Sequence, residues 1–243
     1  MLSLLIKEVK GFLSSVTGYL VIIVYLILNG LLLWVLPSAF NLLNYGYASL
    51  DNYFMLAPWL FLFLVPAITM RTFSEENKSG TIELLLTKPI SEMGIIMAKY
   101  LASVLLILLS IAPTLIYYIS IYALGNPVGN IDTGGTWGAF IGLFFLACSF
   151  AAIGIFSSGI SSNQVVAFII AFLLSIVMYI GSDFVAGINI FNKVAYFIEQ
   201  LGINTHYINM SKGVIDTRDL IYFLSLIAFF LLITRFNMEK RKW

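Results

Sequence analysis

The sequence contains few charges, one cysteine and one histidine. Asp, Glu, Lys and Arg together make up 10% of its 243 residues, while 60% are hydrophobic. A soluble protein has about 25% charged residues, so this composition predicts an integral membrane protein. The single cysteine, Cys148, cannot form an intrachain disulfide, and a net charge of +1 gives no indication of a nucleic-acid partner.

Sites for common enzyme chemistry are also missing. Because His206 is the only histidine, two-histidine metal sites are excluded and a Ser/His/Asp triad would have to use that residue. We expect His206 to be an ordinary loop residue on the outer face. The phosphate-binding pattern G-x-x-x-x-G-K-[ST] does not occur. The sequence therefore predicts no enzyme, and no catalytic, cofactor-binding or metal-ligating residue in this chain.

Long uncharged stretches dominate the sequence. About 20 such residues are enough to cross a bilayer as a helix. Pro37, the Gly125 to Pro127 segment and the turn-forming residues from Ser157 to Gln164 mark helix ends, whereas Pro58 and Pro66 predict kinks within one helix. We predict an all-α integral membrane fold with six transmembrane helices. These helices cover residues 19–36, 54–70, 100–124, 137–156, 165–182 and 220–234.

No ionisable residue lies deep within a predicted transmembrane helix. The last helix is short, so it can cross only if Asp219 and Arg235 reach toward the lipid headgroups or the bilayer thins locally. We expect Asp132 and Asp183 to be solvated caps at outer helix ends. The absence of carboxylates and histidines within the spans disfavours a proton-coupled secondary transporter. Sodium coupling through a helix broken by proline is an alternative.

The distribution of lysines and arginines selects an orientation. Of the 13 basic residues, ten fall in segments on the same side as the amino terminus. Only Lys193, Lys212 and Arg218 fall on the other side. Basic residues are enriched in cytoplasmic loops, so we predict that both termini and residues 71–99 are cytoplasmic.

Two amphipathic helices are predicted outside the spans. Residues 1–15 have apolar side chains at helical spacing with Lys7 and Lys10 opposite, which indicates a helix in the inner membrane interface. A cleaved signal peptide is the competing interpretation, but no small-residue cleavage site follows. Residues 189–201 carry an apolar stripe, with Lys193 and Glu199 off it. We predict an outer helix lying on the bilayer, or alternatively a docking face for an extracytoplasmic accessory protein.

The polar segment from residue 71 to residue 99 joins the second and third spans. Ser79-Gly80 predicts the end of one short helix, because glycine adopts the left-handed conformation that ends helices. A second short helix is predicted from Thr81 to the region before Pro89, with Glu83 near its positive end. Ser91 is predicted to cap the next helix.

Three leucines in this segment suggest an interface. Leu84, Leu85 and Leu86 in a solvated loop would expose apolar surface, which normally marks a binding site. Ile82, Leu85 and Leu86 would share one helix face. The alternative is a solvated connector that is stabilised only by its own helix caps.

The motif Arg71-x-Phe73-x-Glu75-Glu76-x-x-Ser79-Gly80-Thr81-x-Glu83-x-Leu85-Leu86-x-x-Pro89-x-Ser91 follows the second of six predicted spans. In sequence and position it resembles the permease subunits of type-two ABC exporters. The topology matches over nearly the whole chain, and the motif itself covers residues 71–91. Residues 210–224 are similar to the gliding-motility-associated branch of these permeases, which is related to the copper-site assembly permease of nitrous oxide reduction.

This resemblance implies a permease in the bacterial inner membrane, coupled to a cytoplasmic ABC ATPase that binds ATP and Mg. It also implies pairing with a second permease subunit, identical or related, and export across the membrane. A membrane platform that recruits cytoplasmic machinery without transport is the alternative. We expect the acids to pair with bases on the ATPase and the leucines to dock. The expected coupling residues are Glu75, Glu76, Ser79, Gly80, Thr81, Glu83, Leu85 and Leu86.

A ladder of glycines leads into the fourth span. Gly134, Gly138 and Gly142 recur every four residues, so they would lie on one helix face and let another helix approach closely. We predict helix packing at these positions. The partner helix would come from the same bundle or from the second permease subunit.

Overall fold

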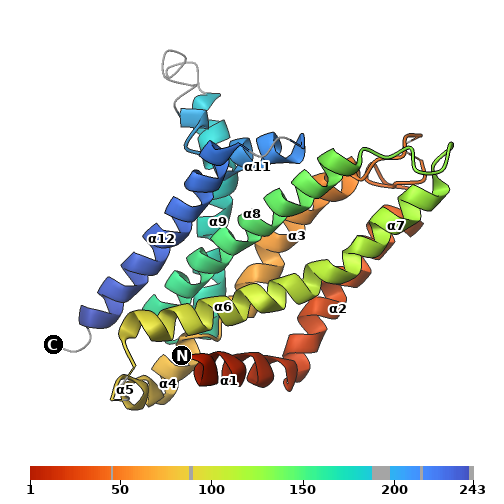
Figure 1. Cartoon of the computed structure of the whole chain (residues 1–243). Coiled ribbons are helices and arrows are strands. Elements are labelled where there is room, and N and C mark those ends of the chain that lie inside the picture. Colours follow the sequence, from red (N-terminus) through yellow and green to blue (C-terminus); the bar gives the residue numbers. More distant parts are fainter. Residues whose placement is uncertain (45, 88–89, 188–197, 214–215, 241–243) are drawn as a thin grey trace.

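The computed structural model describes the whole chain except residues 45, 88–89, 188–197, 214–215 and 241–243. The described part consists of helices and their connections and contains no strand, which confirms the all-α fold (Figure 1). Six helical segments in it are long and apolar enough to cross a membrane. They are α2 (Val16–Gly30) with the π-helical Leu31–Val35, α3 (Asp51–Thr69), α6 (Glu92–Ile111) continued by Ala112–Thr114 and α7 (Leu115–Leu124), α8 (Thr133–Ile160), α9 (Gln164–Ala186) and α12 (Thr217–Glu239).

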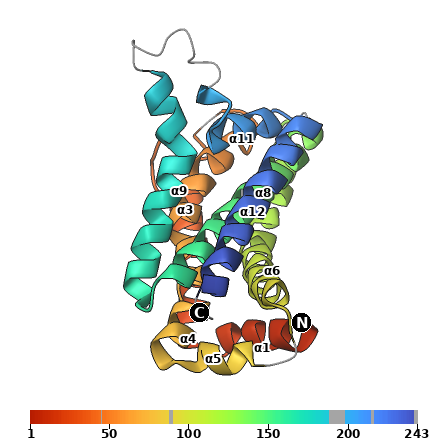
Figure 2. The ribbon, with the colours of Figure 1, turned by 90° about the vertical axis from the view of Figure 1, so that its left-hand side faces the viewer.

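Helix α8 is the central element of the bundle (Figures 1 and 2). In its most apolar stretch 78% of the residues are buried, compared with 22% for α9 at the periphery. The small residues of α8 explain its central position. In a membrane there is no hydrophobic driving force between helices, so close packing has to hold them together, and small residues let neighbouring helices approach closely. A Cβ on Gly154 of α8 would lie 2.0 Å from Oγ1 of Thr69 on α3.

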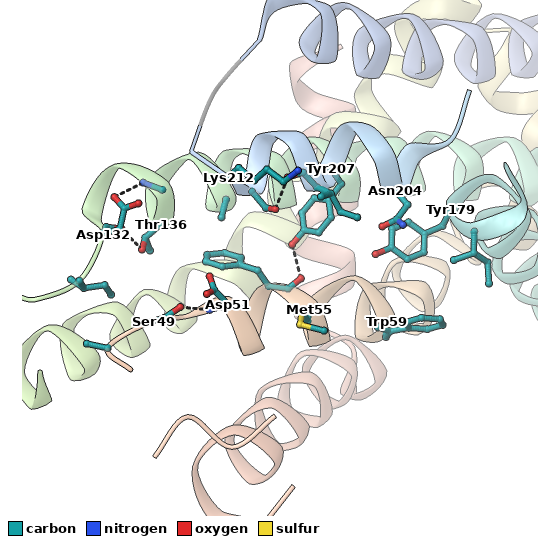
Figure 3. A pocket seen from close by; sticks show the side chains of 18 residues that line it. Ser49, Asp51, Met55, Trp59, Asp132, Thr136, Tyr179, Asn204, Tyr207 and Lys212 are labelled. Carbon is teal, nitrogen blue, oxygen red and sulfur yellow. Dashed lines mark hydrogen bonds between the residues drawn. The ribbon is translucent and has the colours of Figure 1, made fainter. Parts of the chain in front are cut away.

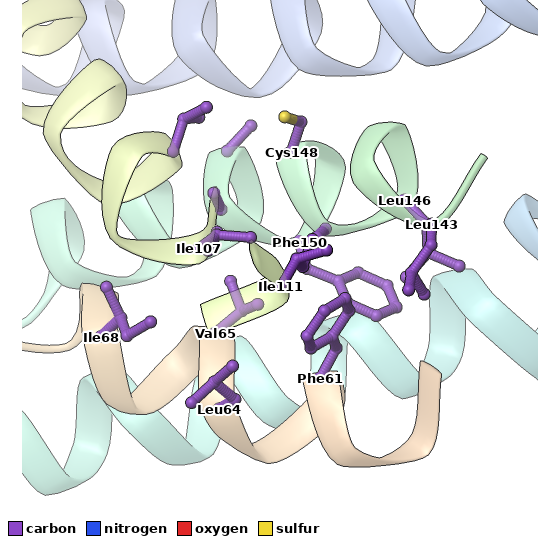
Figure 4. Close-up of a cluster of buried hydrophobic side chains, with 14 of the residues drawn as sticks. Phe61, Leu64, Val65, Ile68, Ile107, Ile111, Leu143, Leu146, Cys148 and Phe150 are labelled. Carbon is purple, nitrogen blue, oxygen red and sulfur yellow. The ribbon is translucent and has the colours of Figure 1, made fainter. Parts of the chain in front are cut away.

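Large apolar side chains fill the spaces between these helices. Phe61 and Val65 of α3, Ile107 of α6 and Phe150 of α8 are all fully buried and gather between the helices in Figure 4. Dispersion contacts among such closely packed groups hold the bundle together. Cys148 lies in the same cluster as a buried free thiol.

Pro58 leaves a gap in the hydrogen bonding of α3 that another helix fills. A proline at this position has no N–H to donate to the carbonyl of Phe54, one turn earlier. The Tyr207 hydroxyl on α11 (Ile203–Ser211) donates to that carbonyl at 2.7 Å. Burial raises the pKa of Tyr207 well above its usual value, so the hydroxyl stays a neutral donor.

The turn between the fourth and fifth spans is shorter than the sequence suggests. We predicted a turn from Ser157 to Gln164, but α8 runs to Ile160 and only residues 161–163 separate it from α9. The prediction was wrong because the serines are satisfied inside the helix. Ser157 Oγ donates to the Ile153 carbonyl at 2.8 Å, and Ser158 binds another helix, as described below. The actual cap is Asn163, whose side chain accepts from the Val165 N–H.

Helix α12 is longer than its uncharged stretch. It has 23 residues, enough for about 34 Å, and the Asp216 side chain accepts from the Arg218 N–H at its start. The expectation that Asp219 reaches toward the headgroups is wrong, because Asp219 is 4% exposed and is paired with His206 inside the protein. Arg235 forms an exposed ion pair with Glu239 at 2.8 Å.

The predicted amphipathic helices have different outcomes. Helix α1 (Leu2–Leu13) confirms the helix predicted over residues 1–15; it runs across one end of the bundle (Figure 2). Leu2 and Ile6 on it are exposed, whereas Leu4 is buried. The helix predicted over residues 189–201 falls mostly on residues outside the described part.

Two of the three glycines in the predicted ladder pack against α11. A Cβ on Gly138 would lie 2.9 Å from Gly213 Cα, and one on Gly142 would lie 2.9 Å from Met210 Cβ. Both distances are shorter than real Cβ contacts, so glycine is required there. Gly134 differs, because its nearest neighbour is the capping side chain Asp132 at 3.6 Å. Gly138 and Gly142 therefore allow helices of this same chain to pack closely.

Candidate functional site

The segment between α3 and α6 forms two short helices at the end of the bundle that also carries α1 (Figures 1 and 2). Helix α4 covers Ser74–Ser79 and helix α5 covers Thr81–Leu86, as predicted. Gly80 joins them with φ +70°, a left-handed conformation that residues with a Cβ rarely adopt. Ser79 and Thr81 bridge the joint through hydroxyls 2.8 Å apart. The backbone geometry of the joint therefore depends on Gly80.

Helix α4 is fastened to the end of α8 by one serine. The Ser158 hydroxyl accepts from the N–H groups of Phe73 and Ser74 at 2.9 and 3.0 Å, and it donates to the Met70 carbonyl at 3.1 Å. The first N–H groups of a helix have no partner within it, so this side chain of α8 satisfies two of them. Asn77 strengthens the junction by donating to the Gly159 carbonyl at 3.2 Å.

A buried lysine joins α4 to α1 and α6. Lys99, on α6, is 1% exposed. Its ammonium group lies 3.0 Å from a carboxylate oxygen of Glu8 on α1 and 3.0 Å from one of Glu76 on α4. It also donates to the Thr72 carbonyl at 2.6 Å. The three N–H donors of the lysine thus have three acceptors, which offsets the cost of burying the charge.

A cavity of about 510 Å³ adjoins this lysine. It lies between α1, α4 and α6 and is lined by charged residues of each helix, among them Glu8, Glu75 and Lys99. Ser79 and Thr81, at the joint between the short helices, contribute hydroxyl groups to its wall. The cavity can accommodate polar side chains of a protein that contacts this end of the bundle.

Comparison with known proteins identifies the family. A family model described as ABC-2 family transporter protein matches residues 38–237, most of the chain. The chain belongs to the ABC-2 family. This ABC-2 chain is therefore a multi-pass membrane permease component of an ABC transporter, not a catalytic enzyme, and such permeases generally work with a cytoplasmic ATPase subunit. A comparison with curated proteins gave no match.

The structure of the ABC-2 permease corrects two predictions about its coupling residues. Leu85 is 7% exposed, as is Ile82, so Leu85 packs into the permease itself and does not form an exposed docking surface. The prediction was wrong because both lie on the face of α5 that turns toward the bundle. Glu76 was expected to pair with a base on a partner, but it pairs with Lys99 of its own chain. By contrast, Glu75, Thr81 and Glu83 are exposed.

The ABC-2 permease also has a buried histidine–aspartate contact at the opposite end that the sequence did not reveal. His206 was expected in a loop, but it lies within α11 and is 7% exposed. Its Nδ1 is 2.6 Å from an oxygen of Asp219 on α12, and its Nε2 is 2.9 Å from the Gln200 carbonyl. The ring stacks on Tyr222. This arrangement fixes α11 to α12, which is a structural role.

Proposed function

We propose that a cytoplasmic ABC ATPase docks on α4 and α5 of this permease and drives export by displacing them. The exposed polar surface of the two helices supports this site. Glu75, Lys78 and Thr81 are exposed there, together with Glu83. Carboxylates on a docking surface pair with basic side chains of the partner and steer its approach. ATP and Mg would be bound by the ATPase, which supplies the phosphate-binding loop that this sequence lacks.

The attachment of α4 is the observation that carries the proposal. A displacement of α4 acts on α8 through Ser158 and on α6 and α1 through Lys99. Since α8 is the central helix, a small shift at this end reaches the whole bundle. A connector without function would not need two buried polar attachments to three other helices.

The orientation follows from the same assignment. We propose that both termini and the α4–α5 segment are cytoplasmic, as the basic residues indicate. Ser79 is exposed, so Ser79→Cys tests this assignment in cells. An impermeant thiol reagent should label it only after the inner membrane is opened. Labelling in intact cells would overturn the orientation.

A second permease subunit, identical or related, would complete the pathway. In α2 and α9 only 22% of the residues in the most apolar stretch are buried within this chain. These helices therefore have faces available to lipid and to another subunit. The similarity of residues 210–224 supports membership of the gliding-motility-associated branch in the bacterial inner membrane.

The decisive experiment measures coupling in the co-purified complex. Gly80→Pro imposes a negative φ on a joint that has φ +70°. In the Gly80→Pro complex we expect ATPase turnover to lose its response to the permease. The control is Gly46→Pro, at another glycine with a positive φ, +78°, at the opposite end of the bundle. This control should leave the response intact. Unchanged association and turnover in Gly80→Pro would refute the coupling role. Association without any effect of the permease on turnover would favour a recruiting platform.

A further inference from the structure

A cavity of about 790 Å³, shown in Figure 3, is lined by α11 and the start of α3, which lie at the end of the bundle opposite α4 and α5 (Figure 1). Its walls come from α3, α8, α9 and α11 and from the residues that precede α3 and α8. The volume falls in the usual range for small-molecule sites, about 300–1,000 Å³. All the residues that line the cavity belong to this chain. The cavity lies far from the surface proposed for the ATPase.

Charged groups surround one end of this cavity. Asp51 begins α3, Asp132 caps α8, and Lys212 follows α11; all three line the cavity and are labelled in Figure 3. Asp51 and Lys212 are exposed, so their charges are available to a ligand. Asp132 uses one oxygen to accept from the Gly135 N–H at 3.0 Å. Two carboxylates and one ammonium group suit a head group that carries both signs of charge.

Apolar groups form the other end. Met55 and Trp59 of α3 line the cavity and remain 62% and 47% exposed, and Trp59 contacts the ring of Tyr179 on α9 edge to face. Trp59 lies two turns beyond Asp51, about 12 Å along the helix. Tryptophan at this depth is typical of the region between headgroups and acyl chains. The wall thus changes from charged to apolar in the direction of the membrane.

We propose that this cavity binds a zwitterionic phospholipid of the surrounding leaflet. The ammonium group of the head group lies between Asp51 and Asp132, its phosphate meets Lys212, and the start of an acyl chain covers Trp59 and Met55. A lipid supplies both a charged head group and an apolar chain, whereas a soluble polar ligand would leave the apolar wall in contact with water. The site is independent of the coupling function proposed for α4 and α5.

Fluorescence of Trp59 provides the test. A variant of the full chain with Trp34, Trp137 and Trp243 replaced by phenylalanine retains Trp59 as its single tryptophan. This variant, in detergent micelles without the ATPase, is titrated with dibrominated phosphatidylethanolamine or phosphatidylglycerol, whose acyl chains quench nearby tryptophan. We expect half-maximal quenching at a lower mole fraction of phosphatidylethanolamine. Equal quenching by the two lipids, or stronger quenching by phosphatidylglycerol, would overturn the proposal.

Substitution of the charged groups makes the test specific. Asp51→Asn and Lys212→Gln should each shift the phosphatidylethanolamine midpoint upward by up to about fivefold, the scale of one exposed ion pair. Arg218→Gln, an exposed residue at the same end that does not line the cavity, should leave it unchanged. Gel filtration and thermal unfolding confirm that these exposed substitutions preserve the fold. If the quenching midpoint for phosphatidylethanolamine is the same in all three variants, Asp51 and Lys212 do not bind the head group.

A competition experiment identifies the source of the head group. Free glycerophosphoethanolamine has the same phosphodiester and ammonium charges as the lipid head but no acyl chain. At an equal concentration it should not reverse the quenching, because the apolar wall contributes nothing to its binding. Reversal by glycerophosphoethanolamine would show a site for soluble ligands and overturn the lipid proposal.

Discussion

The ammonium group of Lys99 and the carboxylate of Glu76 lie 3.0 Å apart, with side chains that are 1% and 16% exposed. They connect α6 to α4, and Glu8 of α1 binds the same ammonium group. A charge this well buried is stable only while its partners remain. The attachment of α4 is therefore sensitive to the loss of the lysine.

Replacement of Lys99 by methionine should destabilise the permease. The change keeps an unbranched side chain that is one atom shorter but leaves two carboxylates without their counter-charge. We expect a loss of about 3 kcal/mol, at the lower end for a buried pair because both carboxylates keep some exposure. Thermal unfolding in detergent measures the effect. Glu75→Gln, an exposed neighbour on α4, is the control, and an equal loss in the two variants would contradict the role of Lys99.

Gly80→Ala should impair coupling more than it impairs folding. The left-handed conformation costs a residue with a Cβ about 1–2 kcal/mol, although nothing lies within 4 Å of the Cβ position. Gly46, with φ +78° and equally open surroundings, is the matched control. Both alanine variants should unfold at similarly reduced temperatures, but only Gly80→Ala should reduce ATPase stimulation in the complex. Gly80→Asn should be milder because asparagine tolerates this conformation.

Ser158→Ala should loosen α4, whereas Ser157→Ala should not. Ser158 satisfies two N–H groups of another segment, and its loss leaves them buried without this acceptor. The expected cost is about 1–3 kcal/mol. Ser157 is equally buried but donates only to a carbonyl of its own helix, so we expect little change. Hydrogen exchange at residues 73–77 and thermal unfolding distinguish the two variants. Similar protection in both would show that the serine bridge is unimportant.

The glycine ladder predicts a graded response. Gly142→Ala places a Cβ 2.9 Å from Met210 and should cost about 1–3 kcal/mol through overpacking. Gly134→Ala meets only an ordinary contact at 3.6 Å and should be neutral or slightly stabilising. Thermal unfolding of the two variants checks this order. A reversed order would mean that α11 does not pack on α8 as described.

Local features of the segment between α3 and α6 were predictable because they depend on neighbouring residues. Gly80 marks the break between α4 and α5, and the Ser91 hydroxyl caps α6 by accepting from the Gly94 N–H at 3.2 Å. Glycine and serine at these positions act through their own backbone and the next turn. The sequence therefore predicted the short helices and their order.

The partners of buried polar groups were not predictable in this way. Ser158 looked like a turn residue, Glu76 like a surface acid and His206 like a loop residue, yet each is bound to another helix. Composition gives no indication of such partners, since the bonded residues lie far apart along the chain. Leu85 was misjudged for a related reason, because burial of a helix face depends on what packs against it.

The sequence by itself determined that the chain crosses a membrane six times as helices, because the bilayer imposes length, low charge and internal hydrogen bonding on every crossing. It also determined the break at Gly80. Only the tertiary structure decided that α8 is central, that α4 is attached through Lys99 and Ser158, and that a cavity with charged and apolar ends forms at the other end of the bundle. These features depend on side chains from separate helices that meet only when the bundle packs.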